Sequence, residues 1–164
     1  IEQLDDELLR ISKESFDALS FNCYALSPDH EKMNHALEIS GLPMIIGEYH
    51  FGTVDRGLAQ SLWQVNSQKE RGDAFRYYTE NAFAHRGLIG TGWFRWIDQN
   101  INGRTDGENY NCGFIDVTDR PYPYMVDAAI ETAKSLYEIH SGTKTPFHQA
   151  PNAVGHSPIP DLWE

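Results

Sequence analysis

The chain has 164 residues and a formal net charge of −11, with 40% hydrophobic and 12% aromatic residues. This length allows a single domain with a buried core, and the composition excludes a disordered protein. The negative charge argues against nucleic acid as a partner, because phosphate backbones would be repelled. No run of 18 apolar residues is present, so no contact with a membrane interior is expected.

The amino-terminal part of the chain predicts two helices separated by a strand. Apolar residues recur at helical spacing over 1–13, with acidic residues before basic ones, an order that suits the helix dipole. An apolar run of strand length follows over 18–24. Ser27 and Pro28 then predict the N-cap and first position of a second helix, which we expect to end at Gly41.

The middle of the chain predicts two further strands with a helix between them. The strands are expected over 44–49 and 88–97, where apolar residues run together. A capping box from Ser67 to Glu70 predicts the start of the intervening helix, and Gly87 its end.

A long polar segment over 98–120 follows the last predicted strand. A loop of this length without regular structure is usually functional or ordered by a partner. Apolar residues over 126–136 then predict a final helix, closed by Gly142. The tail over 143–164 is rich in proline, so we expect it to be irregular.

The predicted elements alternate between helix and strand, which is typical of an α/β fold with a parallel sheet. Continuous apolar strands further indicate a sheet that is covered on both faces. Neither a GxGxxG nor a GxxxxGK[ST] sequence is present, so a nucleotide-binding fold has no support. Three parallel strands fit either part of an open sheet or part of a barrel.

Polar and aromatic residues stand at the ends of all three predicted strands. They are Asn22 and Tyr24 at the first, Glu48 at the second, and Trp96 and Asp98 at the third. The carboxyl ends of parallel strands meet at one edge, where barrels and open α/β sheets build their sites. We therefore expect a functional site at this edge.

Glu48 is the candidate catalytic carboxylate. It comes directly after the apolar residues of its strand, and Gly47 leaves room beside it. Glycosidases use two carboxylates about the scissile bond, and a hydrogen bond from Tyr24 would hold Glu48 ionised and oriented. The alternative is a structural glutamate paired with an arginine such as Arg95, with Tyr24 as a core residue.

His50, Trp93 and Trp96 are candidates for contact with a substrate. His50 follows Glu48 by two residues and could bind a hydroxyl group, although a lone histidine in a loop is more often structural. The odd spacing of Trp93 and Trp96 places them on opposite faces of one strand. Of the two, we favour Trp96 as the surface on which a sugar ring stacks.

The segment from Asp98 to Gly103 matches the opening of a calcium-binding EF-hand loop. The bidentate glutamate of such a loop would fall at Asn109, because Glu108 is one residue early, and the preceding segment predicts a strand rather than a helix. A polar substrate loop is the preferred interpretation. The two cysteines belong to no CxxC pair, so a zinc site is not expected. No cofactor is expected either.

Several of these segments resemble known glycoside hydrolases. The stretch 43–52, with Glu48 at its centre, resembles the seventh barrel strand of the clan A glycoside hydrolases. The segments 92–99 and 103–114 resemble the eighth strand and its loop in family 50, the β-agarases. The resemblance extends over residues 16–140.

The resemblance implies a (β/α)₈ TIM barrel, of which residues 1–142 would be the C-terminal portion with the sixth, seventh and eighth strands. Glu48 would be the nucleophile of a retaining hydrolase and would form a covalent glycosyl-enzyme that water releases. The substrate would be a β-linked galactan, either agarose or its oligosaccharides. The residues lining the sugar site in the long loop would be Asp98, Gln99, Arg104, Glu108 and Asn109.

The second catalytic carboxylate departs from the family pattern. In clan A the acid/base is a glutamate that follows an asparagine at the end of the fourth strand, and no such pair precedes Ala18. We therefore expect the proton donor to lie in an N-terminal half of the barrel outside this chain. The chain alone is expected to be inactive and poorly soluble, because a truncated barrel exposes strand edges.

Three alternatives to a β-agarase stay open at this stage. One is a clan A hydrolase of the β-galactosidase type, another is a catalytically silent carbohydrate-binding barrel, and the third is an acidic α/β domain with no role in sugar binding. A polymeric substrate is met outside the cytoplasm, so the parent protein is expected to be secreted or periplasmic.

Overall fold

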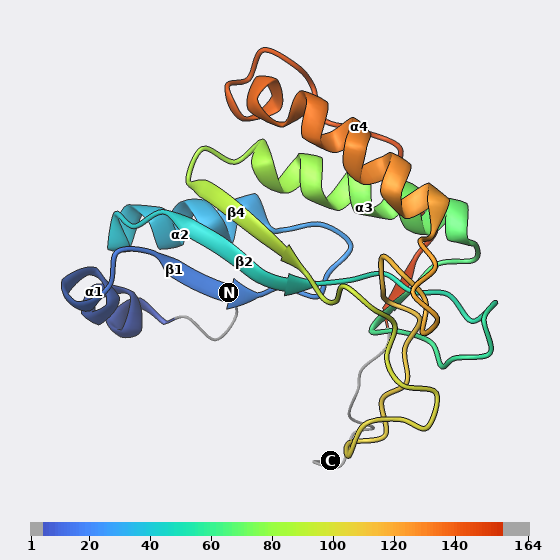
Figure 1. The fold of residues 1–164 in the computed structure, drawn as a ribbon. Coiled ribbons are helices and arrows are strands. Elements are labelled where there is room, and N and C mark those ends of the chain that lie inside the picture. The colour runs from blue at the N-terminus through green and yellow to red at the C-terminus, as the bar shows by residue number, and fades with distance from the viewer. Residues whose placement is uncertain (1–4, 156–164) are drawn as a thin grey trace.

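The computed structural model describes residues 5–155 and is built around a three-stranded parallel sheet (Figure 1). Its strands lie side by side in the order β1 (Leu19–Asn22), β2 (Met44–Tyr49) and β4 (Leu88–Trp93). The helices are α1 (Asp6–Ser15), α2 (His30–Ser40), α3 (Gln68–Phe83) and α4 (Pro123–His140). The α/β class and the alternation of helix and strand are confirmed. The predicted start of the first helix and the end of the tail, residues 1–4 and 156–164, lie outside the described residues.

One face of the sheet is covered by helices, and α4 packs on α3 (Figure 1). Residues of β1 alternate accordingly: Leu19 and Phe21 are buried, whereas Ser20 and Asn22 are exposed. The prediction that both faces are covered is wrong for residues 5–155. The apolar runs that suggested it include Ile45, which pairs with Gly90 and is only partly buried, and Ile89, which is 57% exposed.

Helix α2 begins two residues later than the sequence indicated. Its N-cap is Asp29, whose Oδ1 accepts hydrogen bonds from the amides of Glu31 at 3.0 Å and Lys32 at 3.2 Å. Ser27 is therefore not the cap; its hydroxyl donates to the carbonyl oxygen of Pro28. A carboxylate at this position accepts hydrogen bonds from two amides of the first turn, and its negative charge interacts favourably with the positive end of the helix dipole.

The other predicted helix ends are partly confirmed. Gly41 closes α2 in a left-handed conformation, with φ 68°. Ser67 caps α3 by accepting from the amide of Glu70 at 3.2 Å, but the Glu70 carboxylate accepts from Asn66 at 2.9 Å rather than from the cap residue. Helix α3 stops before the predicted end at Gly87, which belongs to the turn into β4.

Strands β1 and β4 both end earlier than predicted. Trp93 is the last residue of β4, and the following peptide bond between Phe94 and Arg95 is cis. Trp96 therefore lies in a loop, and the predicted placement of the two tryptophans on opposite faces of one strand is wrong. Strand alternation stops where the backbone leaves the sheet.

Part of the proline-rich tail is regular. Strand β5 (Val154–Gly155) pairs antiparallel with β3 (Trp63–Gln64), so the tail is not wholly irregular as predicted. Buried Glu80 of α3 accepts hydrogen bonds from the amide of Phe147 at 2.7 Å and from Nε of Arg76 at 2.9 Å. These contacts hold the tail against the helix layer.

We expect Asp29→Ala to weaken the first turn of α2 by about 1 kcal/mol, because two amides lose their acceptor. Ser27→Ala is the matched control and should change stability by less than about 0.5 kcal/mol. Amide hydrogen exchange over residues 29–36 measures the difference. Equal exchange rates in the two variants would show that Asp29 is not the cap.

Candidate active site

A bulge in β2 turns Glu48 toward the open face of the sheet. Phe21 pairs with Ile46, but the next residue of β1, Asn22, pairs with Glu48, so Gly47 is an extra residue in β2. Paired residues of neighbouring strands point to the same face. Asn22 is exposed on the face away from the helices, and partly buried Glu48 shares that face.

Glycines allow the strands to approach closely beside this carboxylate. A Cβ atom at Gly92 of β4 would lie 2.5 Å from the backbone oxygen of Gly47, and one at Gly47 would lie 2.9 Å from Oδ1 of Asn22. Any larger residue at either position would push the strands or the Asn22 side chain away from the site.

Tyr24 donates a hydrogen bond from its hydroxyl to Oε2 of Glu48 over 2.9 Å, as the sequence predicted. Burial and the bond to Glu48 raise the pKa of Tyr24, so the hydroxyl keeps its proton and remains a donor. The alternative partner, Arg95, makes no ion pair with Glu48 within residues 5–155.

His50 is only 2% exposed, and both of its ring nitrogens are occupied. Nδ1 lies 3.0 Å from the carbonyl oxygen of Phe94, and Nε2 lies 3.1 Å from the amide nitrogen of Leu62. Burial lowers the pKa of His50 to about 4, so the ring is neutral near pH 7. No ring nitrogen is left for a sugar hydroxyl, and the geometry supports the structural alternative.

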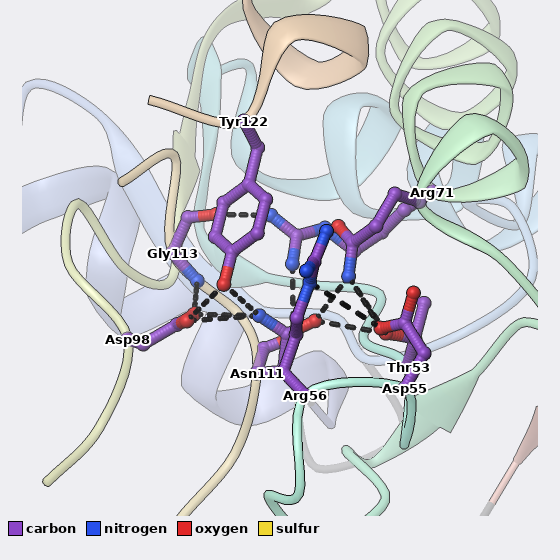
Figure 2. Close-up of polar contacts among 9 residues, drawn as sticks. Thr53, Asp55, Arg56, Arg71, Asp98, Asn111, Gly113 and Tyr122 are labelled. Carbon is purple, nitrogen blue, oxygen red and sulfur yellow. Dashed lines mark hydrogen bonds and ion pairs between the residues drawn. The ribbon is translucent and has the colours of Figure 1, made fainter. Parts of the chain in front are cut away.

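Asp98 points into the protein rather than toward the open face (Figure 2). Its carboxylate accepts hydrogen bonds from Nδ2 of Asn111 at 2.9 and 3.0 Å, the amide of Gly113 at 2.7 Å and the hydroxyl of Tyr122 at 2.6 Å. The EF-hand alternative is therefore wrong, because the first ligand of that loop is fully engaged by donors. The same bonds leave Asp98 unsuited to a sugar contact.

Arg71 of α3 lies at the centre of the same set of side chains and is fully buried (Figure 2). Its guanidinium donates to the carbonyl oxygens of Asn111, at 3.2 Å, and Gly113, and lies 4.5 Å from the centre of the Tyr122 ring. We call Arg71, Asp98, Asn111 and Tyr122 the Arg71 cluster. It fixes the long loop after β4 against α3.

The sequence carries one signal for the burial of Arg71. Arg71 falls on the same helical stripe as Ala74, Phe75 and Tyr78, all of which are buried. A buried guanidinium needs acceptors and a counter-charge. Burial lowers the pKa of Arg71, and the negative charge of Asp98 opposes that shift. The partners themselves lie far away in the sequence.

Gln68 extends the cluster to the loop after β2. Its Nε2 lies 2.7–2.8 Å from Oγ1 of Thr53, Oδ1 of Asp55 and Oδ1 of Asn111. The single hydroxyl proton of Thr53 is shared between Oδ1 of Asp55 and Oδ1 of Asn111. The loops that follow β2 and β4 are thus joined to each other and to α3, beside the edge that carries Glu48.

The other candidate residues of the long loop hold its tip together. Glu108 accepts at Oε2 from Nε2 of Gln99, at 2.7 Å, and from Nη1 of Arg104, at 3.2 Å. Asn109 accepts from the amide of Ala59 at 3.2 Å. Gln99 is completely buried, whereas Arg104 and Glu108 keep exposed surface that a substrate could contact.

The two tryptophans have different environments. Trp93 is partly buried and packs against the core, where it donates from Nε1 to the carbonyl oxygen of Cys112 at 2.6 Å and its ring lies 5.2 Å from the Tyr49 ring. Trp96 is 68% exposed and stacks on Phe114 with ring centres 5.9 Å apart. Trp96 therefore offers the open aromatic surface, and Trp93 does not.

Residues 5–155 contain no group of three or more His, Cys, Asp or Glu side chains placed to hold a metal ion. In the same part of the chain, no helix is long and apolar enough to cross a membrane.

No family model matches this chain. β-Agarase A of Vibrio sp. (strain JT0107) is 39% identical over 128 residues, which cover 74% of this chain and 13% of that protein. β-Agarase B of the same strain is 37% identical over 128 residues, with the same coverage. The homologues of this chain are β-agarases. The chain spans 13% of the length of these curated relatives.

A solved structure, that of an exo-β-agarase, agrees with this relationship. It is 36% identical to this chain, superposes with a TM-score of 0.77, and is matched over 82% of this chain and 18% of its own. The α/β arrangement described above is therefore shared with a β-agarase over most of the chain.

The lowered pKa of His50 makes stability depend on pH. The unfolded chain binds this proton near pH 6.5 and the folded chain near pH 4, so stability falls as the pH drops through that window. Between pH 7 and pH 4 we expect the wild type to lose about 3 kcal/mol more than His50→Gln. Urea unfolding of the intact polypeptide at both pH values measures this, and equal losses would contradict it.

Asp98→Ala should lower the free energy of unfolding by about 3–5 kcal/mol, because buried donors of Asn111, Gly113 and Tyr122 lose their acceptor and Arg71 loses a nearby negative charge. Trp96→Ala, a surface change in the same loop, should stay within about 1 kcal/mol of the wild type and should instead weaken oligosaccharide binding. Thermal unfolding and titration calorimetry separate the two effects. If the Asp98→Ala protein were as stable as the wild type but bound sugar more weakly, Asp98 would contact the sugar after all.

Proposed function

We propose that this chain is the C-terminal portion of a (β/α)₈ barrel in a clan A glycoside hydrolase that cleaves agarose or its oligosaccharides. The supporting observation is Glu48, which lies at the carboxyl edge of a parallel sheet with a hydrogen bond from Tyr24, in a chain whose homologues are β-agarases. Glu48 is the nucleophile of a retaining mechanism in this proposal.

Open surfaces of the structure support a larger barrel. Within residues 5–155, β1 and β4 each pair along only one edge in this sheet. Helices at its two margins keep apolar side chains exposed, among them Leu8 and Ile11 of α1 and Ile130 and Tyr137 of α4. Further strands and helices of the same polypeptide would pair with these edges and cover these side chains.

The chemistry assigned to Glu48 proceeds in two steps. Its carboxylate attacks the anomeric carbon, the glycosidic bond breaks, and the leaving oxygen takes a proton from an acid/base carboxylate supplied by the rest of the barrel. That residue then deprotonates a water molecule, which releases the sugar and frees Glu48. The Tyr24 hydroxyl holds one carboxylate oxygen, which directs the other toward the sugar.

Contacts with the galactan are proposed at the exposed residues around this edge. A sugar ring stacks on Trp96, while Asn22, Arg104 and Glu108 offer hydrogen-bonding groups. We also propose that the parent protein acts outside the cytoplasm, where a polymer of this kind is met.

Glu48→Gln should lower kcat on agarose oligosaccharides by at least about 10³-fold, because an amide cannot form the glycosyl-enzyme. Reducing-sugar release by the full-length translation product that contains residues 1–164 measures kcat, and calorimetry should show unchanged oligosaccharide affinity. Glu108→Gln is the matched carboxylate control and should mainly raise KM. Turnover that survives Glu48→Gln would refute the nucleophile assignment, whereas sugar binding without turnover in the wild type would favour a silent binding barrel.

A further inference from the structure

The side chain of Tyr24 is held in place by His50. The two rings meet edge to face, with centres 4.9 Å apart and planes at 68°. Within residues 5–155, His50 is the one aromatic or imidazole ring in contact with the Tyr24 ring. Tyr24 follows Cys23, whose amide donates to the backbone oxygen of Glu48 at 2.9 Å. The backbone is therefore held beside β2, and the His50 ring limits where the Tyr24 hydroxyl can point.

The hydrogen bonds of His50 define one tautomer and one ring orientation. The carbonyl oxygen of Phe94 can only accept, so Nδ1 carries the proton, and the amide of Leu62 can only donate, so Nε2 is the acceptor. A ring held at both nitrogens cannot rotate without breaking a buried hydrogen bond.

His50 also joins the segments that surround the carboxylate. Its backbone continues β2, Phe94 follows β4, and Leu62 belongs to the loop between β2 and β3. The ring of Tyr110, from the long loop after β4, lies 5.8 Å from the His50 ring at an angle of 76°. The imidazole is thus fixed by three segments and touches Tyr24 from a fourth.

We infer that His50 is a positioning residue, which acts on catalysis by holding the Tyr24 hydroxyl on Oε2 of Glu48 and not by touching the sugar. The inference rests on the proposed role of Glu48 as nucleophile and adds a residue that holds the hydrogen-bond donor of Glu48 in place. A neutral imidazole suits this task because protonation at Nε2 would remove the acceptor for Leu62.

The first test compares His50→Gln with the wild type in the full-length translation product. We expect kcat on agarose oligosaccharides to fall by about 10- to 100-fold, because the Tyr24 hydroxyl loses its fixed direction. KM should change by less than about threefold, since His50 has no nitrogen free for the substrate. A large rise in KM at unchanged kcat would overturn the inference in favour of a sugar contact.

His85→Gln is the matched control for loss of a buried histidine. His85 is also almost fully buried, with Nε2 3.2 Å from Oδ1 of Asn34 and Nδ1 accepting from the amide of Gly87, but it lies at the opposite end of β4. We expect His85→Gln to lower the melting temperature and to leave kcat within about twofold of the wild type. An equal loss of kcat in both histidine variants would reduce the role of His50 to general stability.

A double-mutant cycle decides whether His50 acts through Tyr24. If it does, adding His50→Gln to Tyr24→Phe should lower kcat by no more than about a further twofold, because the hydroxyl to be positioned is already gone. Multiplicative losses would overturn the inference, and so would a Tyr24→Phe variant with wild-type kcat. The cycle compares the effect of His50→Gln on kcat with and without the Tyr24 hydroxyl. A loss of kcat caused by general damage to the fold is the same in both backgrounds and drops out of the difference.

Failure of the inference and failure of the proposed function give different results. If Glu48→Gln abolishes turnover while His50→Gln does not, the nucleophile stands and the role of His50 is refuted. If Glu48→Gln turns over normally, both fall, because there is then no nucleophile for Tyr24 and His50 to position.

Discussion

The burial of the Arg71 guanidinium is the constraint on which the loops of this protein depend. A cation removed from water has to find acceptors and a negative charge, and Arg71 finds them in the carbonyl oxygens of Asn111 and Gly113 and in nearby Asp98. All three lie in the segment after β4, so pairing the charge also folds that segment onto α3. The long polar loop is therefore ordered by side chains of its own chain, among them Arg71 and Gln68 of α3.

The position of Glu48 follows from a different local cause, the extra residue Gly47 in β2. Without the bulge, strict alternation would give Glu48 the helix-facing orientation of Ile46, among buried apolar side chains. With it, Glu48 shares the open face with Asn22, and the Tyr24 hydroxyl can reach its carboxylate. Gly92 and Gly47 are needed beside the carboxylate, because a Cβ atom at either position would clash with the Gly47 backbone or with the Asn22 side chain.

Two systems of buried polar groups therefore support the carboxylate edge. The Arg71 cluster joins the loops to α3, and His50 joins the end of β2 to the segments around it. Neither presents a group to the open face. The open face carries Glu48 and Asn22, with the Tyr24 hydroxyl bonded to the Glu48 carboxylate, while Trp96 and Glu108 keep exposed surface in the long loop after β4.

The sequence by itself determined the order of the four helices and the three parallel strands and placed Glu48 near the end of β2, because these depend on periodicity, glycine and the meeting of strand ends at one edge. It offered the bond from Tyr24 beside the alternative of a core tyrosine, and it gave no sign of the short strands β3 and β5. It placed Trp96 and Asp98 near the site but could not tell that one is exposed and the other buried. Only the tertiary structure decided that Asp98 pairs with Asn111 and Tyr122, and that both nitrogens of His50 are occupied. These outcomes depend on partners 12 to 44 residues away, whose distance in space no local pattern encodes.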